Sequence, residues 1–212
     1  MGRYFQANLA PGFFGNAGVP SIKSRFIELF GDPVSNSKAL PTQTLASVAP
    51  IEGDSMPKSG AVWLLNLDAI ESGTGRILRN EMTEAQDAKS STIAFSERHV
   101  LISKLRPYLN KVVIPHSAGI CTSELLPLLP NKDYLSQVYL AYTLRSDSFV
   151  RFISQHVAGA KMPRIDLRAF KSFEIPIPEM SSQLGFEDFV TQVDKLRFDT
   201  LNLNNVRAAH CS

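Results

Sequence analysis

Residues 173–206, FEIPIPEMSSQLGFEDFVTQVDKLRFDTLNLNNV, contain the boundary on which the fold depends. The stretch Phe173–Pro178 predicts an extended exit from a globular domain, because its two prolines exclude a central position in a sheet. From Ser181 onward the pattern predicts an amphipathic helix over 181–212, because apolar residues recur at three- and four-residue spacing at Phe186, Phe189, Val193, Leu196, Leu203 and Val206.

A helix of about thirty residues is long enough to leave the globular body and pair with another helix. Acidic Glu187 and Asp188 precede basic Lys195 and Arg197, an order that complements the helix dipole. A helix that packs back onto its own domain would show the same pattern, and this alternative stays open. We assign to dimerisation or partner binding the residues Phe186, Phe189, Val193, Leu196 and Leu203.

Before this boundary, short strands and helices alternate without internal repeats, which predicts an α+β class: one mixed globular domain over 32–180, followed by the long helix. Strands are expected at 61–67, at 100–105 with alternating burial, and at 111–115, with a turn or exposed loop at 72–75. Helices are expected at 134–145 and from Asp147 to Gly159, the second burying Phe149, Phe152, Ile153 and Val157.

The N-terminal region divides at about residue 20. Residues 1–20 contain four glycines, two prolines and three phenylalanines without a helical or strand period, so we expect a flexible tail. A short helix over 21–31 follows. Ser21 or Ser24 caps it, and Gly31 with Pro33 ends it.

Basic residues gather in one part of the chain. The 212 residues carry a net charge of only +2, but residues 98–171 contain eleven Lys and Arg against four acids, a local charge of +7. The remainder has eleven basic and sixteen acidic residues, a charge of −5. Such asymmetry is expected of a surface that faces a polyanion. An uneven scatter without function is the alternative.

The two cysteines, Cys121 and Cys211, make no disulfide framework and suit a reducing compartment. The sequence has neither an apolar stretch of membrane-spanning length nor a secretory signal pattern, so we expect a cytoplasmic protein.

Enzyme signatures are weak. Gly53-Asp54-Ser55-Met56 resembles the nucleophile block of a serine hydrolase, but the residue three before His210 is Arg207 rather than the acid that this chemistry needs. Asp87-Ala88-Lys89 lacks a fixed partner acid for a nuclease metal site, and the histidines and cysteines show no metal-ligand spacing. We expect no catalytic residues, no metal and no cofactor bound by this chain.

Two basic turns are better candidates for a binding site. A strand from Val100 delivers Lys104 and Arg106 to a turn that Pro107 makes rigid, and Tyr108, Asn110 and Lys111 follow. Gly159 to Asp166 forms a second turn that presents Lys161 and Arg164. Cations, an amide and an aromatic ring on constrained turns suit phosphate positioning with base contact, although ordinary solvated hairpins would look similar.

Several blocks, in this order, resemble the target-recognition half of type I restriction–modification specificity subunits. The similarity spans about residues 24–200 and rests on SRFIELFGDP (24–33), RPYLNK (106–111), GICTSE (119–124), LRSD (144–147), GAKMPR (159–164), FEIPIP (173–178) and Gln183.

The resemblance implies a role in recognition without catalysis. In that family two recognition domains, separated by two long antiparallel helices, each contact half of a split DNA target. The helices bind methyltransferase subunits, S-adenosylmethionine, ATP and Mg are used by the partner subunits, and a restriction subunit cleaves. This chain has one recognition domain, and its last helix ends early in 207–212, so we expect a half-subunit that dimerises or joins another half, or a truncated chain.

The leading hypothesis is sequence-specific binding of double-stranded DNA, with both turns side by side in one groove. Lys104, Lys111, Lys161 and Arg164 would hold phosphates, and Arg106, Tyr108 and Asn110 would contact base edges. A non-DNA-binding adaptor that acts through its C-terminal helix is the alternative, and a hydrolase built on Ser55 ranks third.

Overall fold

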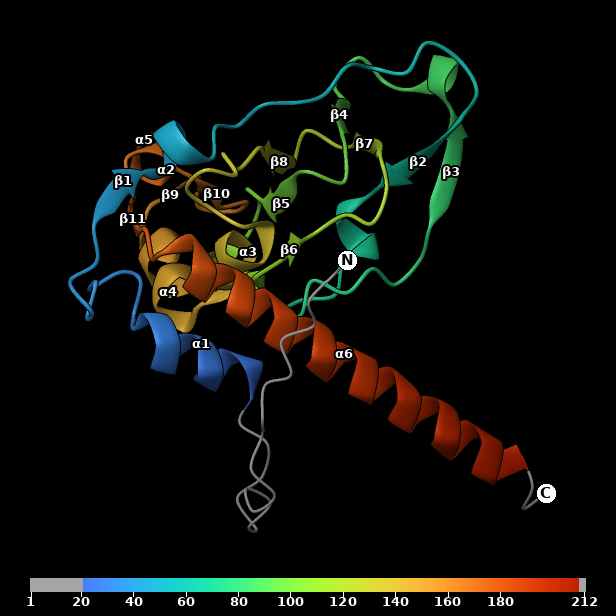
Figure 1. The fold of residues 1–212 in the computed structure, drawn as a ribbon. Coiled ribbons are helices and arrows are strands. Elements are labelled where there is room, and N and C mark those ends of the chain that lie inside the picture. The colour runs from blue at the N-terminus through green and yellow to red at the C-terminus, as the bar shows by residue number, and fades with distance from the viewer. Residues whose placement is uncertain (1–20, 210–212) are drawn as a thin grey trace, which may run out of the picture.

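Helices cover one face of a small central sheet, and a second sheet covers its other face (Figure 1). This computed structural model describes the backbone of residues 21–209 and the side chains of residues 21–196. Helices and strands build one globular body with a C-terminal helix, so the predicted α+β class is confirmed. The expected tail over 1–20 lies outside the described residues.

The central sheet has the antiparallel order β6-β5-β8, formed by β5 (Val100–Ser103), β6 (Val112–Val113) and β8 (Leu125–Leu128). Val100 and Ile102 belong to the hydrophobic cluster on the helical side, whereas Leu101 belongs to the cluster between the sheets. All four residues of β5 are buried. The predicted alternation of burial is therefore wrong, because both faces of this strand are covered.

The second sheet has the order β3-β2-β7-β4, in which β2 pairs parallel with β7 and the other pairs are antiparallel. Its strands are β2 (Ala61–Leu65), β3 (Glu81–Glu84), β4 (Ile93–Phe95) and β7 (Gly119–Cys121), with single 3-10 turns at Leu67–Ala69 and Ala85–Asp87. Trp63, Leu65 and Phe95 pack in the cluster that Leu101 joins. The expected strand at 61–67 is thus two residues shorter than predicted.

The helical layer contains α1 (Ile22–Phe30), α3 (Gln137–Arg145) and α4 (Asp147–Gln155). The Ser21 hydroxyl accepts a hydrogen bond from the Ser24 amide at 3.1 Å, and Gly31 with φ 76° ends α1, as the capping pattern predicts. Two shorter helices, α2 (Leu45–Val48) and α5 (Leu167–Lys171), lie next to each other at the left-hand edge of the body in Figure 1.

The predicted end of α4 at Gly159 is wrong. The helix ends at Gln155, and the chain continues into β9 (Val157–Ala158), which pairs antiparallel with β10 (Arg164–Ile165). Val157, expected to be buried, is 36% exposed and pairs with Ile165 in this hairpin. Phe149 and Ile153 are buried as predicted.

The expected extended exit is confirmed. β11 (Glu174–Pro176) pairs with β1 (Thr42–Thr44) in a two-stranded sheet apart from the central one. This position satisfies the restriction that proline places on strands.

The C-terminal helix α6 (Met180–Ala209) packs on its own domain in its first half and extends beyond the body in its second (Figure 1). Phe186 is fully buried, and its ring centroid lies 5.5 Å from that of Phe26 in α1. Phe189 and Val193 are partly buried against the same cluster. Phe186 is therefore a core residue, and its assignment to a partner-binding surface is corrected, whereas the assignment of the partly exposed Phe189 and Val193 stays a prediction. Leu196 is 66% exposed, and Leu203 lies beyond the described side chains.

Gln183 fastens the start of α6 to the body. Its fully buried amide accepts a hydrogen bond from the Ser136 amide at 2.9 Å and donates to the carbonyls of Tyr134 at 2.8 Å and Pro178 at 2.9 Å. A buried amide with these three bonds is well satisfied and fixes where α6 begins. Within residues 21–209, no helix is both long and apolar enough to cross a membrane.

Candidate nucleic-acid interface

The two basic turns lie next to each other. Leu105 and Arg164 form an antiparallel bridge, the Arg106 amide donates to the Pro163 carbonyl at 2.8 Å, and the Ile165 amide donates to the Lys104 carbonyl at 2.8 Å. Segments 104–106 and 163–165 are thus joined by backbone hydrogen bonds. The predicted proximity of the turns is confirmed.

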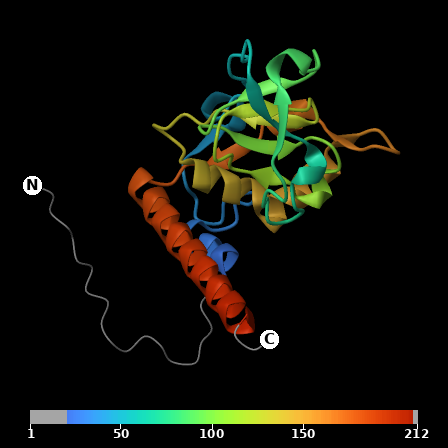
Figure 2. The ribbon, with the colours of Figure 1, turned by 90° about the vertical axis from the view of Figure 1, so that its right-hand side faces the viewer.

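The second turn is the tip of the β9–β10 hairpin, which projects from the body on the side away from α6 (Figure 2). Gly159 has φ 89°, in the left-handed region that glycine tolerates best. Residues 159–162 are exposed, including Lys161 and an apolar side chain, Met162, that is 44% exposed. An exposed cation beside an exposed methionine on a projecting hairpin suits entry into a groove.

The first turn is held in an unusual backbone conformation. Arg106 and Asn110 have φ values of 50° and 49°, in the left-handed region, and flank a 3-10 turn at Pro107–Leu109. Pro107 is buried, whereas Arg106 is exposed and Tyr108 is 57% exposed. Non-glycine residues in this region cost free energy and gather at functional sites. The turn therefore presents a cation and an aromatic ring on a fixed backbone.

Asn110 and Lys111 point inward instead. The Asn110 side-chain amide donates to the Arg145 carbonyl at 3.0 Å, and the Lys111 ammonium donates to the Leu67 carbonyl at 2.8 Å. Both side chains are half-buried and engaged in holding the turn. The assignment of Asn110 to base edges and of Lys111 to phosphates is therefore corrected.

Arg164 also differs from the prediction. Its guanidinium donates to the Glu124 carboxylate through Nη2 at 3.0 Å and through Nε at 3.3 Å. This charge-assisted contact raises the pKa of Arg164 and neutralises its charge locally. Among the described side chains, by contrast, no ion pair involves Arg106, Lys161 or the half-buried Lys104.

The structure thus brings Arg106, Tyr108 and Lys161 to the solvent at the joined turns, where Lys104 is half-buried. Met162 at the hairpin tip was not predicted from the sequence, nor was Glu124 as the partner of Arg164. An apolar residue between glycine and proline in a basic turn was the available signal for Met162. Nothing local marks Glu124, which lies 40 residues before Arg164.

Other chemistry has less structural support. Ser55 and His116 line one cavity, but within the part of the chain that the structure describes no hydrogen bond joins their side chains, and the His116 ring stacks on Trp63 at 4.7 Å. The Asp54 carboxylate instead contacts Arg98 at 3.3 Å. Among the described residues, no group of three or more His, Cys, Asp or Glu could hold a metal ion.

Known proteins resemble this chain in sequence and in fold. No family model matches the chain. Over 127 residues, 60% of this chain and 27% of the relative, it is 24% identical to the specificity subunit of the type I restriction enzyme EcoDI from Escherichia coli. In sequence and in fold, this chain is similar to type I specificity subunits.

The fold likeness comes from two solved structures. The HsdS subunit from Thermoanaerobacter tengcongensis superposes with a TM-score of 0.59 at 20% identity, over 81% of this chain and 45% of that one. A chain from a type I R-M system, solved to explain its complex assembly and conformational transition, gives a TM-score of 0.62 at 20% identity, over 80% and 46%. The resemblance to type I specificity subunits is confirmed, and this chain spans less than half the length of these relatives.

Proposed function

We propose that the chain binds double-stranded DNA in a sequence-specific manner, as the recognition part of a type I restriction–modification system. One observation carries this proposal: two basic turns from distant segments are joined at Leu105 and Arg164, and Arg106 and Lys161 face the solvent from them. The likeness to type I specificity subunits supports the same function.

The two turns suit different contacts. Lys161, on the projecting tip, is an exposed point charge of the kind that holds phosphate oxygens irrespective of base. Arg106 stands on a fixed backbone, and a planar guanidinium can donate two hydrogen bonds to one guanine. Tyr108 and Met162 add apolar surface for sugars, thymine methyl groups or an opened base step. Lys104 is a further phosphate contact.

Partners and cofactors are part of this proposal. A methyltransferase subunit and a restriction subunit would supply catalysis with S-adenosylmethionine, ATP and Mg, whereas this chain would contribute recognition alone. A split target needs two recognition domains, so a second copy of this chain or another half-subunit would complete it. The second half of α6 extends from the body and would be the segment for such pairing (Figure 1).

Selection of bound fragments from a pool of random duplexes, at low and moderate salt, tests the proposal on the full chain. We expect enrichment of one motif. Arg106→Ala should relax one position by about 1–3 kcal/mol, and Lys161→Ala should weaken all duplexes alike and lower the log–log salt slope by about 0.9.

Lys132→Ala is the matched control, because Lys132 is also exposed but lines a cavity with Met180 at the start of α6. Absence of any enriched motif would overturn the proposal. Unchanged affinity and salt slope in both Arg106→Ala and Lys161→Ala would overturn the assignment of the surface.

An adaptor that acts through α6 without binding DNA is the second candidate. The observation in its favour is the projecting helix, on which Leu196 is 66% exposed. The same selection separates the two functions, since an adaptor enriches no motif at either salt concentration.

A further inference from the structure

Arg145, at the C-terminal end of α3, contacts the segment that follows the Arg106–Asn110 turn. Its guanidinium donates to the Val112 carbonyl through Nη2 at 2.7 Å and through Nε at 3.1 Å. Val112 belongs to β6, the strand into which the turn leads. The side chain therefore fixes the chain immediately after the turn to the end of a helix.

The backbone of the same residue holds the turn itself. The Arg145 carbonyl accepts the hydrogen bond from the Asn110 side chain at 3.0 Å. Asn110 is the last residue of the turn and has φ 49°. Because one residue of α3 contacts both Asn110 and Val112, the exit of the turn is held at two points.

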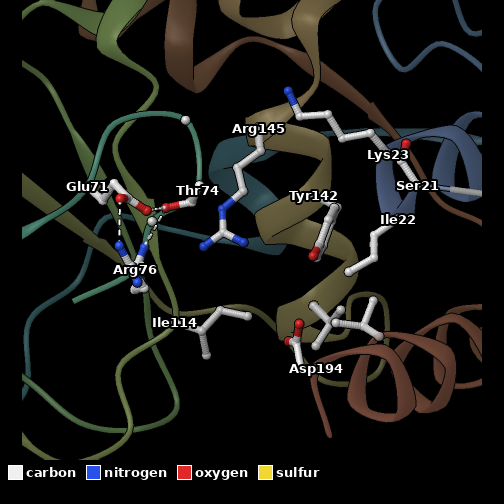
Figure 3. A pocket seen from close by; sticks show the side chains of 14 residues that line it. Ser21, Ile22, Lys23, Glu71, Thr74, Arg76, Ile114, Tyr142, Arg145 and Asp194 are labelled. Atoms are coloured by element: carbon white, nitrogen blue, oxygen red, sulfur yellow. Dashed lines mark hydrogen bonds and ion pairs between the residues drawn. The ribbon is translucent and has the colours of Figure 1, made fainter. Parts of the chain in front are cut away.

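The turn over residues 71–76 supports this contact from the opposite side. Figure 3 shows Arg145 pointing into a cavity of about 640 Å³ between Tyr142 and the turn over residues 71–76. In that turn the Gly73 amide donates to the carbonyls of Leu109 at 3.2 Å and Asn110 at 3.0 Å. Gly75, with φ 71°, lies against Val112 and the Arg145 guanidinium so closely that a Cβ would overlap both.

We propose that Arg145 is a positioning residue for DNA recognition: it holds the Arg106–Asn110 turn so that Arg106 meets its base at a fixed angle. The inference rests on the proposed function. Arg145 is half-buried behind the turn and acts through Asn110 and Val112 rather than by touching DNA. A displacement of about 1 Å at Arg106 would break a two-bond contact with a base, whereas phosphate contacts tolerate such a shift.

Arginine suits this position for a physical reason. Its planar fork places two donors on one carbonyl, and its cation lies 5.5 Å from the centroid of the Tyr142 ring. Lysine keeps the charge but has a single flexible ammonium group, which cannot reproduce this geometry. Arg145→Lys is therefore the conservative variant that separates charge from position.

The test uses the full chain and two duplexes: the selected motif, and the same motif changed at the position that Arg106→Ala relaxes. We expect Arg145→Lys to lower the affinity ratio of the two duplexes about tenfold, while the salt slope stays unchanged. In an Arg106→Ala background the same substitution should change the ratio by less than about twofold, because the contact through which it acts is gone.

Arg151→Ala is the matched control, an exposed arginine on the neighbouring helix α4 that faces the α1 side. If Arg145→Lys fails to fold, Asn110→Ala removes the other contact and carries the same expectation. The inference is overturned if neither Arg145→Lys nor Asn110→Ala changes the affinity ratio of the wild-type chain. It is also overturned if these substitutions lower the ratio as much in the Arg106→Ala background as in the wild-type chain. Neither outcome overturns the proposed function. A wild-type chain without sequence preference overturns both.

Discussion

Arg164 and Glu124 form a two-bond ion pair at the base of the hairpin, although Arg164 was expected to hold a phosphate. Their side chains are 43% and 27% exposed, so the pair lies at the edge of the proposed DNA surface. The carboxylate removes one positive charge from that surface and ties β10 to the loop before β8. Arg164, which the sequence analysis assigned to a phosphate, therefore holds the hairpin in place instead.

Replacing Glu124 should therefore change how the chain binds DNA. In Glu124→Gln, Arg164 becomes an unpaired cation, and we expect tighter binding to every duplex, a salt slope steeper by up to about 0.9, and weaker discrimination between sequences. Arg164→Ala should leave the salt slope unchanged, unlike Lys161→Ala. A slope that falls in Arg164→Ala would mean that Arg164 leaves Glu124 to hold a phosphate.

The left-handed backbone conformation of Arg106 should lower the stability of the chain, while the side chain at this position would contribute to recognition. Glycine adopts this conformation without penalty, whereas other residues cost about 1–2 kcal/mol. Arg106→Gly should accordingly be about 1 kcal/mol more stable in urea unfolding than Arg106→Ala, while both lose preference for the target base. Equal stabilities of the two variants would show that the turn relaxes out of this conformation.

The anchoring of α6 can be measured by unfolding. Phe186→Ala removes a fully buried ring and should cost about 3–5 kcal/mol. Leu196→Ala, on the projecting part of the same helix, should stay within about 0.5 kcal/mol in a dilute monomer. If Leu196→Ala lowered the free energy of unfolding as much as Phe186→Ala does, the projecting part of α6 would be covered in solution.

Cys121 offers a probe of opening between the sheets. Burial raises the pKa of its thiol to about 12, so at pH 8 the thiol is almost entirely protonated and unreactive. The thiolate population, and with it labelling of the folded chain, should rise as the pH approaches that value. In a Cys211→Ser variant, labelling near neutral pH should be slow and should accelerate in denaturant together with unfolding. Rapid labelling of the folded chain would contradict the packing of β7.

Local signals explain what the sequence analysis predicted well. The caps of α1 at Ser21 and Gly31 act within a few residues, and the prolines at 176 and 178 restrict the backbone wherever the chain lies. The proximity of the basic turns was also predicted, because their shared charge indicated one surface. The caps and the prolines needed no knowledge of distant partners, whereas the proximity of the turns was inferred from charge alone.

The errors have the opposite origin. Lys111 and Asn110 turn inward to carbonyls that lie 44 and 35 residues away, and the pattern of a basic turn contains no sign of them. The apolar residues of α6, among them Phe186, recur at the spacing of an interface helix. A helix that packs on its own domain has the same spacing. Periodicity identifies the apolar face but not the surface that covers it.

The tip of the β9–β10 hairpin, residues 159–162, belongs to neither hydrophobic cluster. Exchanges there remove no core contacts, so mutational drift at these positions carries little risk of misfolding. Under the proposed function, exchanges at these positions would alter how the hairpin tip contacts DNA while the scaffold is inherited unchanged.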